Sequence, residues 1–483
     1  MEEIAASSNR LGYVWVLFTG EFLLRFAFWT IQSTIILYFS RISGINLNSA
    51  YAIFGSFTAL SFIMPILGGL FRNITGIGFR ILVISGLWVV LLGAILLVLQ
   101  LNMGLTYLGL TAIAVGAGLY LPNATLYLGE LFTDQDKKKI RGFAFIYLSS
   151  NIAGVTAPII SGIIIQHYNW AFIFIPTVLG ILVWLGLVSF TNFFPKKDDT
   201  LKINLRSKIL FLGLLLSMFV FCYCDLVFAK LMSSSIPFIV IFFIILLIYI
   251  ISKSQTKHKI NLIRLLLLSL LVIVYYAFLY QLQSSLLVFI KNYVNLDFYS
   301  YSLPANVFVS FEPAIIILIF PIVMRFLNKI VRQDHYLSNP TGIIVVGGMT
   351  GAISFLVFYL IITFNIYTLH SALGILFVGT IGLAIGDLMI LPAFNVAIVT
   401  YSPLELKGLI VGLSSLPFAF SGYLSSQIAR IIQLEPHSTV SNLSKFSVAY
   451  LYMFLFLIVF SSMIGFIVFS IKQKFNRIEQ VLI

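Results

Sequence analysis

Residues 81–99 read ILVISGLWVVLLGAILLVL and contain no charged side chain. A helix of about 20 such residues is long enough to cross the hydrocarbon core of a membrane. Comparable apolar runs recur from Leu11 to Ile471, and 60% of the 483 residues are hydrophobic while only 9% are charged. An average soluble domain carries about 25% charged residues. The chain is therefore predicted to be an all-α integral membrane protein.

Fourteen segments have the length and composition of a membrane span, and they group as six, then two, then six. The predicted spans are 11–39, 50–71, 79–100, 103–127, 141–166, 169–194, 208–229, 235–252, 262–290, 304–330, 341–364, 369–400, 407–432 and 446–471. We expect an N-terminal half at 11–194, an inserted helical hairpin with flanking cytoplasmic loops at 195–260, and a C-terminal half at 261–471. Two six-helix halves resemble the major-facilitator fold, in which a cavity lies between the halves near the membrane midplane.

The basic residues indicate how the chain is oriented. With the N-terminus placed inside, 23 of the 29 Lys and Arg residues fall on the inner side of the predicted spans and 5 on the outer side. Such an excess on the cytoplasmic side favours a topology with both termini inside. The net charge of +13 therefore reflects membrane orientation, and nucleic acid is not expected as a partner.

Four ionisable residues lie deep within predicted spans: Glu21, Arg25, Glu312 and Asp387. A charge at the bilayer centre costs from about 3 to over 10 kcal/mol, so each needs a structural or functional reason. Glu21 and Arg25 are four residues apart and can pair on one helix face. The pair is either a structural salt bridge that fixes the first helix or part of a cavity that rearranges during transport.

Each of the two acids in the second half lies near a proline. Glu312 comes directly before Pro313, and Asp387 comes five residues before Pro392. A proline removes one backbone hydrogen bond and loosens the helix around it. We interpret each acid as a binding or gating element; the alternative is an acid that is hydrogen-bonded to a neighbouring helix.

The deep charges do not balance, because three acids face one arginine. Uncompensated negative charges are costly in a low dielectric, so either a proton binds or a cationic substrate supplies the balance. We predict that Glu312 or Asp387 is protonated in one conformational state.

Motifs in both halves resemble those of the proton-dependent oligopeptide transporters, a branch of the major facilitators. The resemblance runs from about Glu21 to Gly422, with the motifs in the same order. The corresponding positions are Glu21, Arg25 and Phe26; Pro65, Gly68 and Gly69; Gly118, Pro122 and Asn123; Gly142, Phe143, Tyr147, Asn151 and, after one extra residue, Gly154; Tyr275, Tyr276 and Gln281; Ser310, Glu312 and Pro313; and Gly386 and Asp387.

The resemblance implies a proton-coupled symporter of small peptides or related amine-bearing compounds that works by alternating access. Its partners would be protons, the substrate and the lipid bilayer, and we expect a monomer in the inner (plasma) membrane of a bacterium. No cofactor or metal is expected, and an enzyme is not favoured, because no histidine has metal-ligand spacing. The implied substrate-binding residues are Arg25, Gln32, Tyr51, Tyr147, Asn151, Tyr276, Gln281, Glu312 and Asp387, and the implied proton-coupling residues are Glu21, Arg25, Glu312 and Asp387.

The chain departs from the family pattern at the positions that matter for coupling. The family's second first-helix glutamate is Leu24 here, and its helix-four lysine is Leu121. A further first-helix arginine, which helps to hold a peptide carboxylate, falls at Gln32, and a helix-eight asparagine is Glu312. We therefore expect coupling to have shifted to Glu312 and Asp387, and a substrate that depends on its amine more than on a free carboxylate.

Two other functions stay open at this stage. Major-facilitator architecture also serves proton-antiport exporters of cationic metabolites or drugs, and the fold alone does not decide the direction. The missing ion pair at Leu24 and Leu121 also keeps open a membrane sensor that binds a ligand without transporting it.

Overall fold

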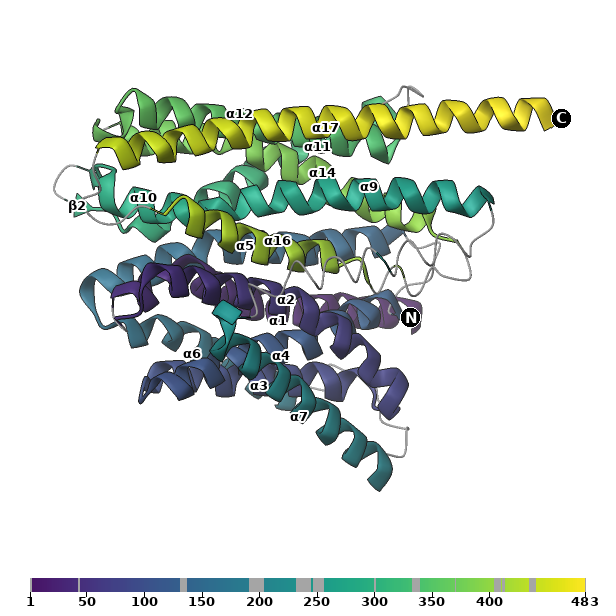
Figure 1. Ribbon diagram of the computed structural model, residues 1–483. Coiled ribbons are helices and arrows are strands. Elements are labelled where there is room, and N and C mark those ends of the chain that lie inside the picture. Colours follow the sequence, from purple (N-terminus) through teal and green to yellow (C-terminus); the bar gives the residue numbers. More distant parts are fainter. Residues whose placement is uncertain are drawn as a thin grey trace. The chain divides into compact units, whose positions relative to one another are not determined.

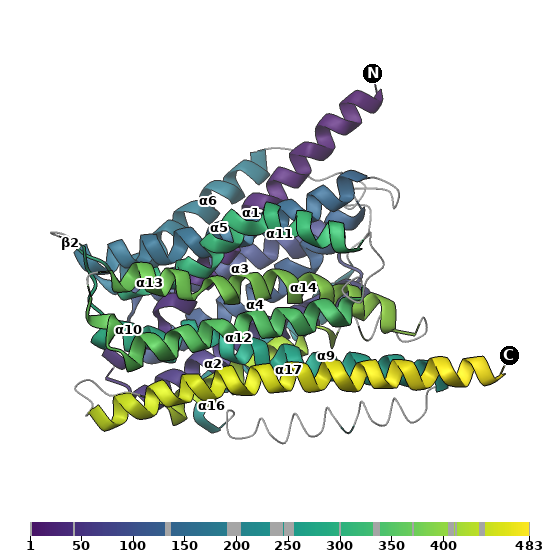
Figure 2. The same cartoon turned by 90° about the horizontal axis from the view of Figure 1, so that it is seen from above.

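The computed structural model divides into two compact units, Met1–Met232 and Ser233–Ile483, and each is described by itself. The described residues are 2–41, 44–130, 137–190, 204–231, 245, 256–298, 301–331, 339–369, 371–403, 410, 413–433 and 440–482. Within each unit, long helices lie side by side (Figures 1 and 2).

The first unit is helical throughout its described residues. Its elements are α1 (Glu2–Arg41), α2 (Leu47–Thr75), α3 (Phe79–Leu99), α4 (Met103–Glu130), α5 (Lys137–His167), the short 3-10 helix η1 (Trp170–Phe174), α6 (Ile175–Phe190) and α7 (Leu205–Val227). Several helices begin at an asparagine: the side chains of Asn46 and Asn204 accept hydrogen bonds from the backbone N–H of Ser49 and Ser207, each at 2.9 Å. Such caps satisfy N–H groups that have no partner inside the helix.

Helix α4 lies at the centre of this unit and packs against α2, α3 and α7. At the α2–α4 crossing, a Cβ atom on Gly68 would lie only 2.0 Å from the carbonyl oxygen of Gly118. The side-chain amide of Asn123 donates to the carbonyl of Gly68 at 3.3 Å across the same crossing. Gly68, Gly118 and Asn123, which correspond to family motif positions, therefore allow the backbones of α2 and α4 to lie in close contact.

Helix α7 packs against α2 and α4 through one buried face that contains Met218, Cys222, Asp225 and Leu226. Most of its other large apolar side chains are exposed, as expected for a lipid-facing helix. The second helix of the predicted hairpin, 235–252, lies outside the described residues apart from position 245. The hairpin and the domain limits 11–194, 195–260 and 261–471 therefore stay predictions.

The second unit is also built of helices, with one very short antiparallel strand pair between two of them. Its elements are α9 (Thr256–Leu279), η3 (Tyr280–Leu282), α10 (Ser285–Tyr293), β1 (Asp297–Phe298), β2 (Tyr301–Ser302), η4 (Ala305–Ser310), α11 (Phe311–Val331), α12 (Pro340–Thr363), η6 (Ile366–Thr368), α13 (Ala372–Gly379), α14 (Ile381–Tyr401), α16 (Leu416–Ile431) and α17 (Val440–Leu482). Helix α12 packs against α14 and α17, and Figure 2 shows α17 running along α12.

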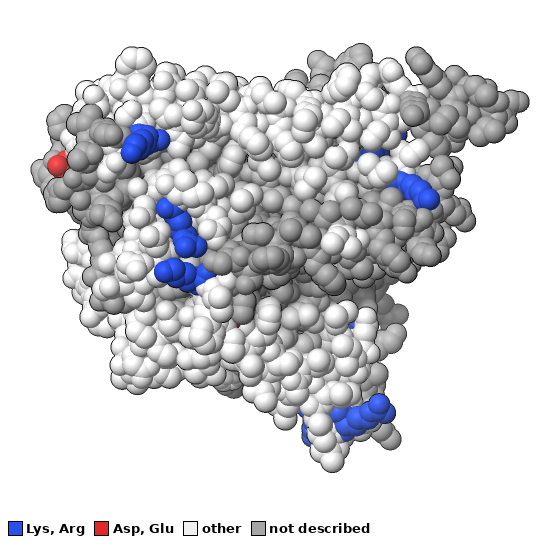
Figure 3. All heavy atoms as spheres, in the orientation of Figure 1, with Lys and Arg blue, Asp and Glu red and all other residues white. Residues whose placement is uncertain are grey.

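The described residues contain 12 helical segments that are long and apolar enough to cross a membrane. Of the fourteen predicted spans, 235–252 falls outside the described residues, and 407–432 is described mainly over α16. The predicted span 262–290 corresponds to His258–Tyr293, which is interrupted by η3. Figure 3 shows that the visible described surface is almost free of charge, with Lys and Arg in a few separate patches. The prediction of an all-α membrane protein agrees with these helices.

Candidate functional site

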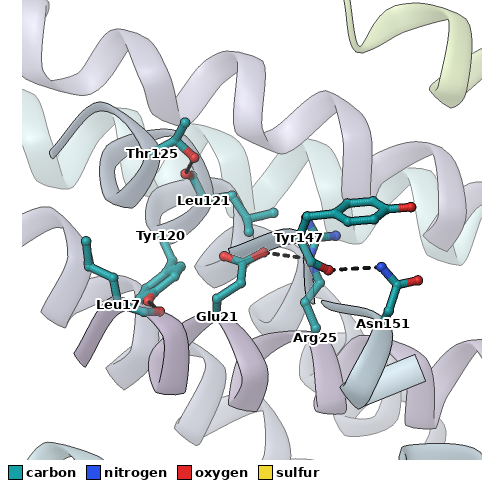
Figure 4. A network of polar contacts seen from close by, with 8 residues as sticks. All are labelled: Leu17, Glu21, Arg25, Tyr120, Leu121, Thr125, Tyr147 and Asn151. Atoms are coloured by element: carbon teal, nitrogen blue, oxygen red, sulfur yellow. Dashed lines mark hydrogen bonds and ion pairs between the residues drawn. The ribbon is translucent and has the colours of Figure 1, made fainter. Parts of the chain in front are cut away.

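The first group of predicted site residues surrounds an ion pair on α1. The Nε atom of Arg25 donates to Oε1 of Glu21 at 2.8 Å (Figure 4). The Glu21 side chain is 5% exposed and that of Arg25 is 26% exposed. The four-residue spacing in the sequence predicted this contact correctly, because residues i and i+4 lie on one helix face.

Helix α4 presents mainly apolar groups to this ion pair. Leu121 extends from α4 toward the side of α1 that carries Glu21 and Arg25 (Figure 4). Tyr120, the preceding residue, donates its hydroxyl to the backbone carbonyl of Leu17 at 2.9 Å. Leu24 on α1 is 1% exposed. The two positions at which the family resemblance implies an ion pair are therefore occupied by leucines, of which Leu24 is buried and Leu121 is partly buried.

Tyr147 and Asn151 lie on α5, which packs against α1. The side-chain amide of Asn151 donates to the backbone carbonyl of Tyr147 at 2.9 Å (Figure 4). Two of the residues predicted to bind substrate therefore lie together with the α1 ion pair.

Gln32 and Tyr51 are enclosed within the first unit. The Gln32 amide nitrogen donates to the Thr58 hydroxyl of α2 at 2.9 Å, and the residue is 1% exposed. Tyr51 is fully buried. In this conformation Gln32 links α1 to α2 and is shielded from any ligand.

The second group lies in the second unit and centres on two carboxylates. The hydroxyl of Tyr276, on α9, donates a short hydrogen bond to Oδ1 of Asp387 on α14. Glu312 lies on α11, which packs against α14. Asp387 is 8% exposed and Glu312 is 7% exposed. Three helices that are far apart in the sequence thus bring Tyr276, Glu312 and Asp387 together.

The local backbone explains where Glu312 lies. The 3-10 helix η4 ends at Ser310, and α11 begins at Phe311, so Glu312 occupies the first turn of an α-helix inside a predicted span. The positive end of the helix dipole interacts favourably with an acidic side chain at this position. Pro313 fits here because the N–H groups of a first helical turn have no partner inside the helix.

Gln281 lies at the break between α9 and α10 and is fully buried. Its amide nitrogen donates to the hydroxyl of Ser425 at 3.0 Å, and its amide oxygen accepts from Ser285 at 2.7 Å. The Ser285 hydroxyl in turn lies 2.9 Å from that of Tyr450 on α17. Sequence reasoning missed Ser285, Ser425 and Tyr450, because single serines and tyrosines in apolar runs carry no signal of such a network.

Tyr275, the neighbour of Tyr276, has a packing role. Its hydroxyl donates to the backbone carbonyl of Leu383 at 2.6 Å, and the residue is fully buried. A Cβ atom on Gly351 or on Gly386 would lie 2.5 Å from its ring or hydroxyl. Tyr275 therefore fills the space beside two glycines of α12 and α14.

The structure gives no support for a metal centre in its described part. Among those residues, no group of three or more His, Cys, Asp and Glu side chains is placed to hold a metal ion. Cys222 and Cys224 are free thiols on α7.

A comparison with protein families finds that the POT family model matches residues 79–448. Dipeptide and tripeptide permease B of Aliivibrio fischeri (strain MJ11) is 25% identical over 349 residues, covering 71% of this chain and 70% of that protein. The permease of the same name from Yersinia enterocolitica is 23% identical over 332 residues, covering 67% of each. The uncharacterized transporter YclF of Bacillus subtilis is 29% identical over 182 residues, covering 37% of this chain and 36% of that protein.

Solved structures share the fold at lower identity. A POT family transporter in complex with 5-aminolevulinic acid is 18% identical with a TM-score of 0.78, covering 95% of this chain and 96% of that chain. A bacterial homologue of the human drug peptide transporters PepT1 and PepT2 is 17% identical with a TM-score of 0.79, covering 96% and 99%. The fold is therefore that of the POT transporters within the major-facilitator class.

Proposed function

The chain belongs to the POT family of membrane peptide transporters, and on that premise we propose that it is a proton-coupled symporter of small peptides or related amine-bearing compounds. It is a multi-pass membrane protein and not an enzyme. The proposed mechanism is alternating access with proton coupling at Glu312 and Asp387. The proposed setting is a monomer in a bacterial inner membrane, with both termini inside.

The observation that carries this proposal is the pair of buried carboxylates in the second unit. Glu312 and Asp387 are both buried on helices that pack against each other, and Asp387 accepts a hydrogen bond from Tyr276. Two negative charges at membrane depth are costly unless a proton or an ammonium group compensates them. A pair in which one carboxylate holds a proton while the other holds a substrate amine carries both across in the same step and so couples them.

The ion pair of the first unit has a different proposed role. Glu21 and Arg25 already compensate each other at 2.8 Å, so they add no net charge. We propose that Arg25 exchanges Glu21 for a substrate group during the cycle, while Tyr147 and Asn151 line the same side of α1. Leu24 and Leu121 support the proposal that proton coupling lies in the second unit, because a leucine side chain cannot carry a proton.

Purified protein in liposomes tests the proposal directly. An inward proton gradient should drive accumulation of a labelled dipeptide such as dialanine. The double variant Glu312→Gln with Asp387→Asn should abolish this accumulation, because neither side chain can then carry the coupled proton. Asp297→Asn, which removes an exposed acid of the same unit, is the matched control and should keep it. Proton-driven uptake that survives the double change contradicts the coupling proposal.

The same liposomes separate the alternatives. Substrate that leaves the compartment as protons enter it would instead support an exporter. Ligand binding without flux in either direction would support a sensor.

A further inference from the structure

Tyr276, which donates the hydrogen bond to Asp387, is enclosed by other aromatic rings. Its ring centroid lies 5.4 Å from that of Tyr275 and 6.1 Å from that of Tyr280. The ring of Phe418 is nearer, at 4.7 Å, and meets it edge-on with an interplanar angle of 77°. Tyr275 and Tyr280 belong to α9 and η3, whereas Phe418 comes from α16. The closest of these three rings is therefore supplied by a different helix.

Phe418 also contacts the helix that carries Asp387. Its ring centroid lies 6.2 Å from that of Phe394 on α14. Phe394 follows Asp387 by seven residues, or two helical turns, so the two lie on the same face of α14. Phe418 thus touches both the ring of the donor and the helix of the acceptor. The three helices form a closed set of contacts around the hydrogen bond between Tyr276 and Asp387.

Hydrogen bonds fix α16 against α9. The hydroxyl of Ser421 donates to the backbone carbonyl of Ile273 at 3.0 Å. The backbone carbonyl of Ser425 accepts from the side-chain amide of Gln281 at 3.1 Å. Both serines are fully buried. Because Ile273 and Gln281 come before and after Tyr276 in the chain, these bonds hold α16 along the stretch that carries Tyr276.

We propose that Phe418 is a positioning residue, whose ring holds Tyr276 in the orientation in which its phenol donates to Asp387. A hydrogen bond weakens steeply when its donor turns away from the acceptor. An edge-to-face contact with a neighbouring ring favours one orientation of an aromatic side chain over others. This inference rests on the proposed function, in which Asp387 holds the coupled proton or the substrate amine. Phe418 has no group that binds either, so it acts through Tyr276.

A double-mutant cycle separates this role from packing alone. In liposomes, Phe418→Leu should reduce proton-driven dialanine uptake by at least about fivefold, because the Tyr276 hydroxyl is no longer held against Asp387. Tyr276→Phe has already lost that hydroxyl, so adding Phe418→Leu to it should reduce uptake by less than about twofold more. Equal fold losses in the two backgrounds overturn the proposal, since packing is lost in both.

Phe278→Leu is the matched control. Phe278 is 8% exposed, as Phe418 is, and its ring also contacts two others, those of Phe355 and Phe456 at 5.6 and 6.1 Å. It lies two residues after Tyr276, about 200° around α9, so the two side chains extend from opposite sides of the helix. We expect this variant to melt at a lower temperature while uptake stays within about twofold of the wild type. The same loss of uptake as in Phe418→Leu would overturn the assignment.

Melting temperatures of the full-length protein in detergent give the same cycle without transport. Tyr276→Phe keeps the ring against which Phe418 packs, so the two effects on stability add unless Phe418 holds the hydroxyl. We expect Phe418→Leu to lower the melting temperature by about 2 °C or more beyond its effect in Tyr276→Phe, and equal shifts overturn the proposal. If Phe418→Leu does not fold, Phe418→Met replaces it in both cycles, because methionine adapts to irregular space. A wild-type protein without proton-driven uptake rejects the proposed function, and the melting cycle then still decides the role of Phe418.

Discussion

The hydroxyl of Tyr276 donates a hydrogen bond to Oδ1 of Asp387, although the two residues lie 111 positions apart in the chain. The bond joins α9 to α14, and Tyr276 is 6% exposed and Asp387 8% exposed. A neutral donor stabilises a carboxylate by hydrogen bonding without cancelling its charge. The negative charge of Asp387 thus stays available to a proton or to a substrate amine.

Tyr276→Phe removes this donor and keeps the aromatic ring that packs against Phe418 at a centroid distance of 4.7 Å. We expect proton-driven uptake to fall by about tenfold or more, because a hydrogen bond to a charged group contributes about 1.5–3 kcal/mol. Initial uptake rates in liposomes measure the effect. Tyr275→Phe is the control, since its hydroxyl bonds the Leu383 backbone. We expect that variant to melt at a lower temperature with little change in uptake; equal uptake in both variants would remove Tyr276 from the coupling site.

The Glu21–Arg25 pair gives a prediction about stability. Glu21→Gln alone leaves Arg25 without its partner, and we expect a loss of about 1–3 kcal/mol, reduced from the value for a fully buried pair because Arg25 is 26% exposed. The double variant Glu21→Gln with Arg25→Gln should lose less, since no charge is left unpaired. Melting temperatures in detergent compare the two. A double variant that is less stable than the single variant contradicts this account of the pair.

Helices and contacts within one segment could be predicted from the sequence, whereas contacts between distant segments could not. Apolar runs of membrane length form helices because a helix satisfies its own backbone hydrogen bonds in lipid. The Glu21–Arg25 pair followed from its four-residue spacing. The Tyr276–Asp387 bond and the Gln281–Ser425 bond, over 111 and 144 positions, depend on how helices pack, which no local pattern encodes.

The sequence did not predict the break in the helix at η3, for a similar reason. The predicted span 262–290 contains no proline or glycine, which are the residues that usually interrupt a helix. In the structure, Gln281 bonds Ser425 and Ser285 at this break, so side chains supply hydrogen bonds where the helix pattern stops. Gln32 is a comparable case: the sequence shows that position 32 carries no charge, but it does not show the bond of Gln32 to Thr58.

Gln281→Leu tests whether Gln281 binds substrate or joins helices. The change removes hydrogen bonds to Ser425 and Ser285 in a fully buried place. Ser285 keeps its contact with Tyr450, but the buried Ser425 hydroxyl loses its partner, which costs about 1–3 kcal/mol, so we expect a clear drop in melting temperature. If Gln281 joins helices, the relative uptake rates of different labelled dipeptides stay as in the wild type. A changed ranking at wild-type stability would make Gln281 a substrate ligand.

Gly68→Ala tests the crossing of α2 and α4 that supports the first unit. The added Cβ atom would lie 2.0 Å from the backbone carbonyl oxygen of Gly118, and a backbone atom cannot move aside as a side chain can. We expect a loss of at least about 1–3 kcal/mol, seen as a lower melting temperature and poor yield. Gly186→Ala on α6 is the matched control, because nothing lies within 4 Å of its added Cβ. Alanine has the higher helix propensity, so the control should melt at or above the wild-type temperature. If the two variants melt alike, the α2–α4 crossing does not depend on the missing side chain of Gly68.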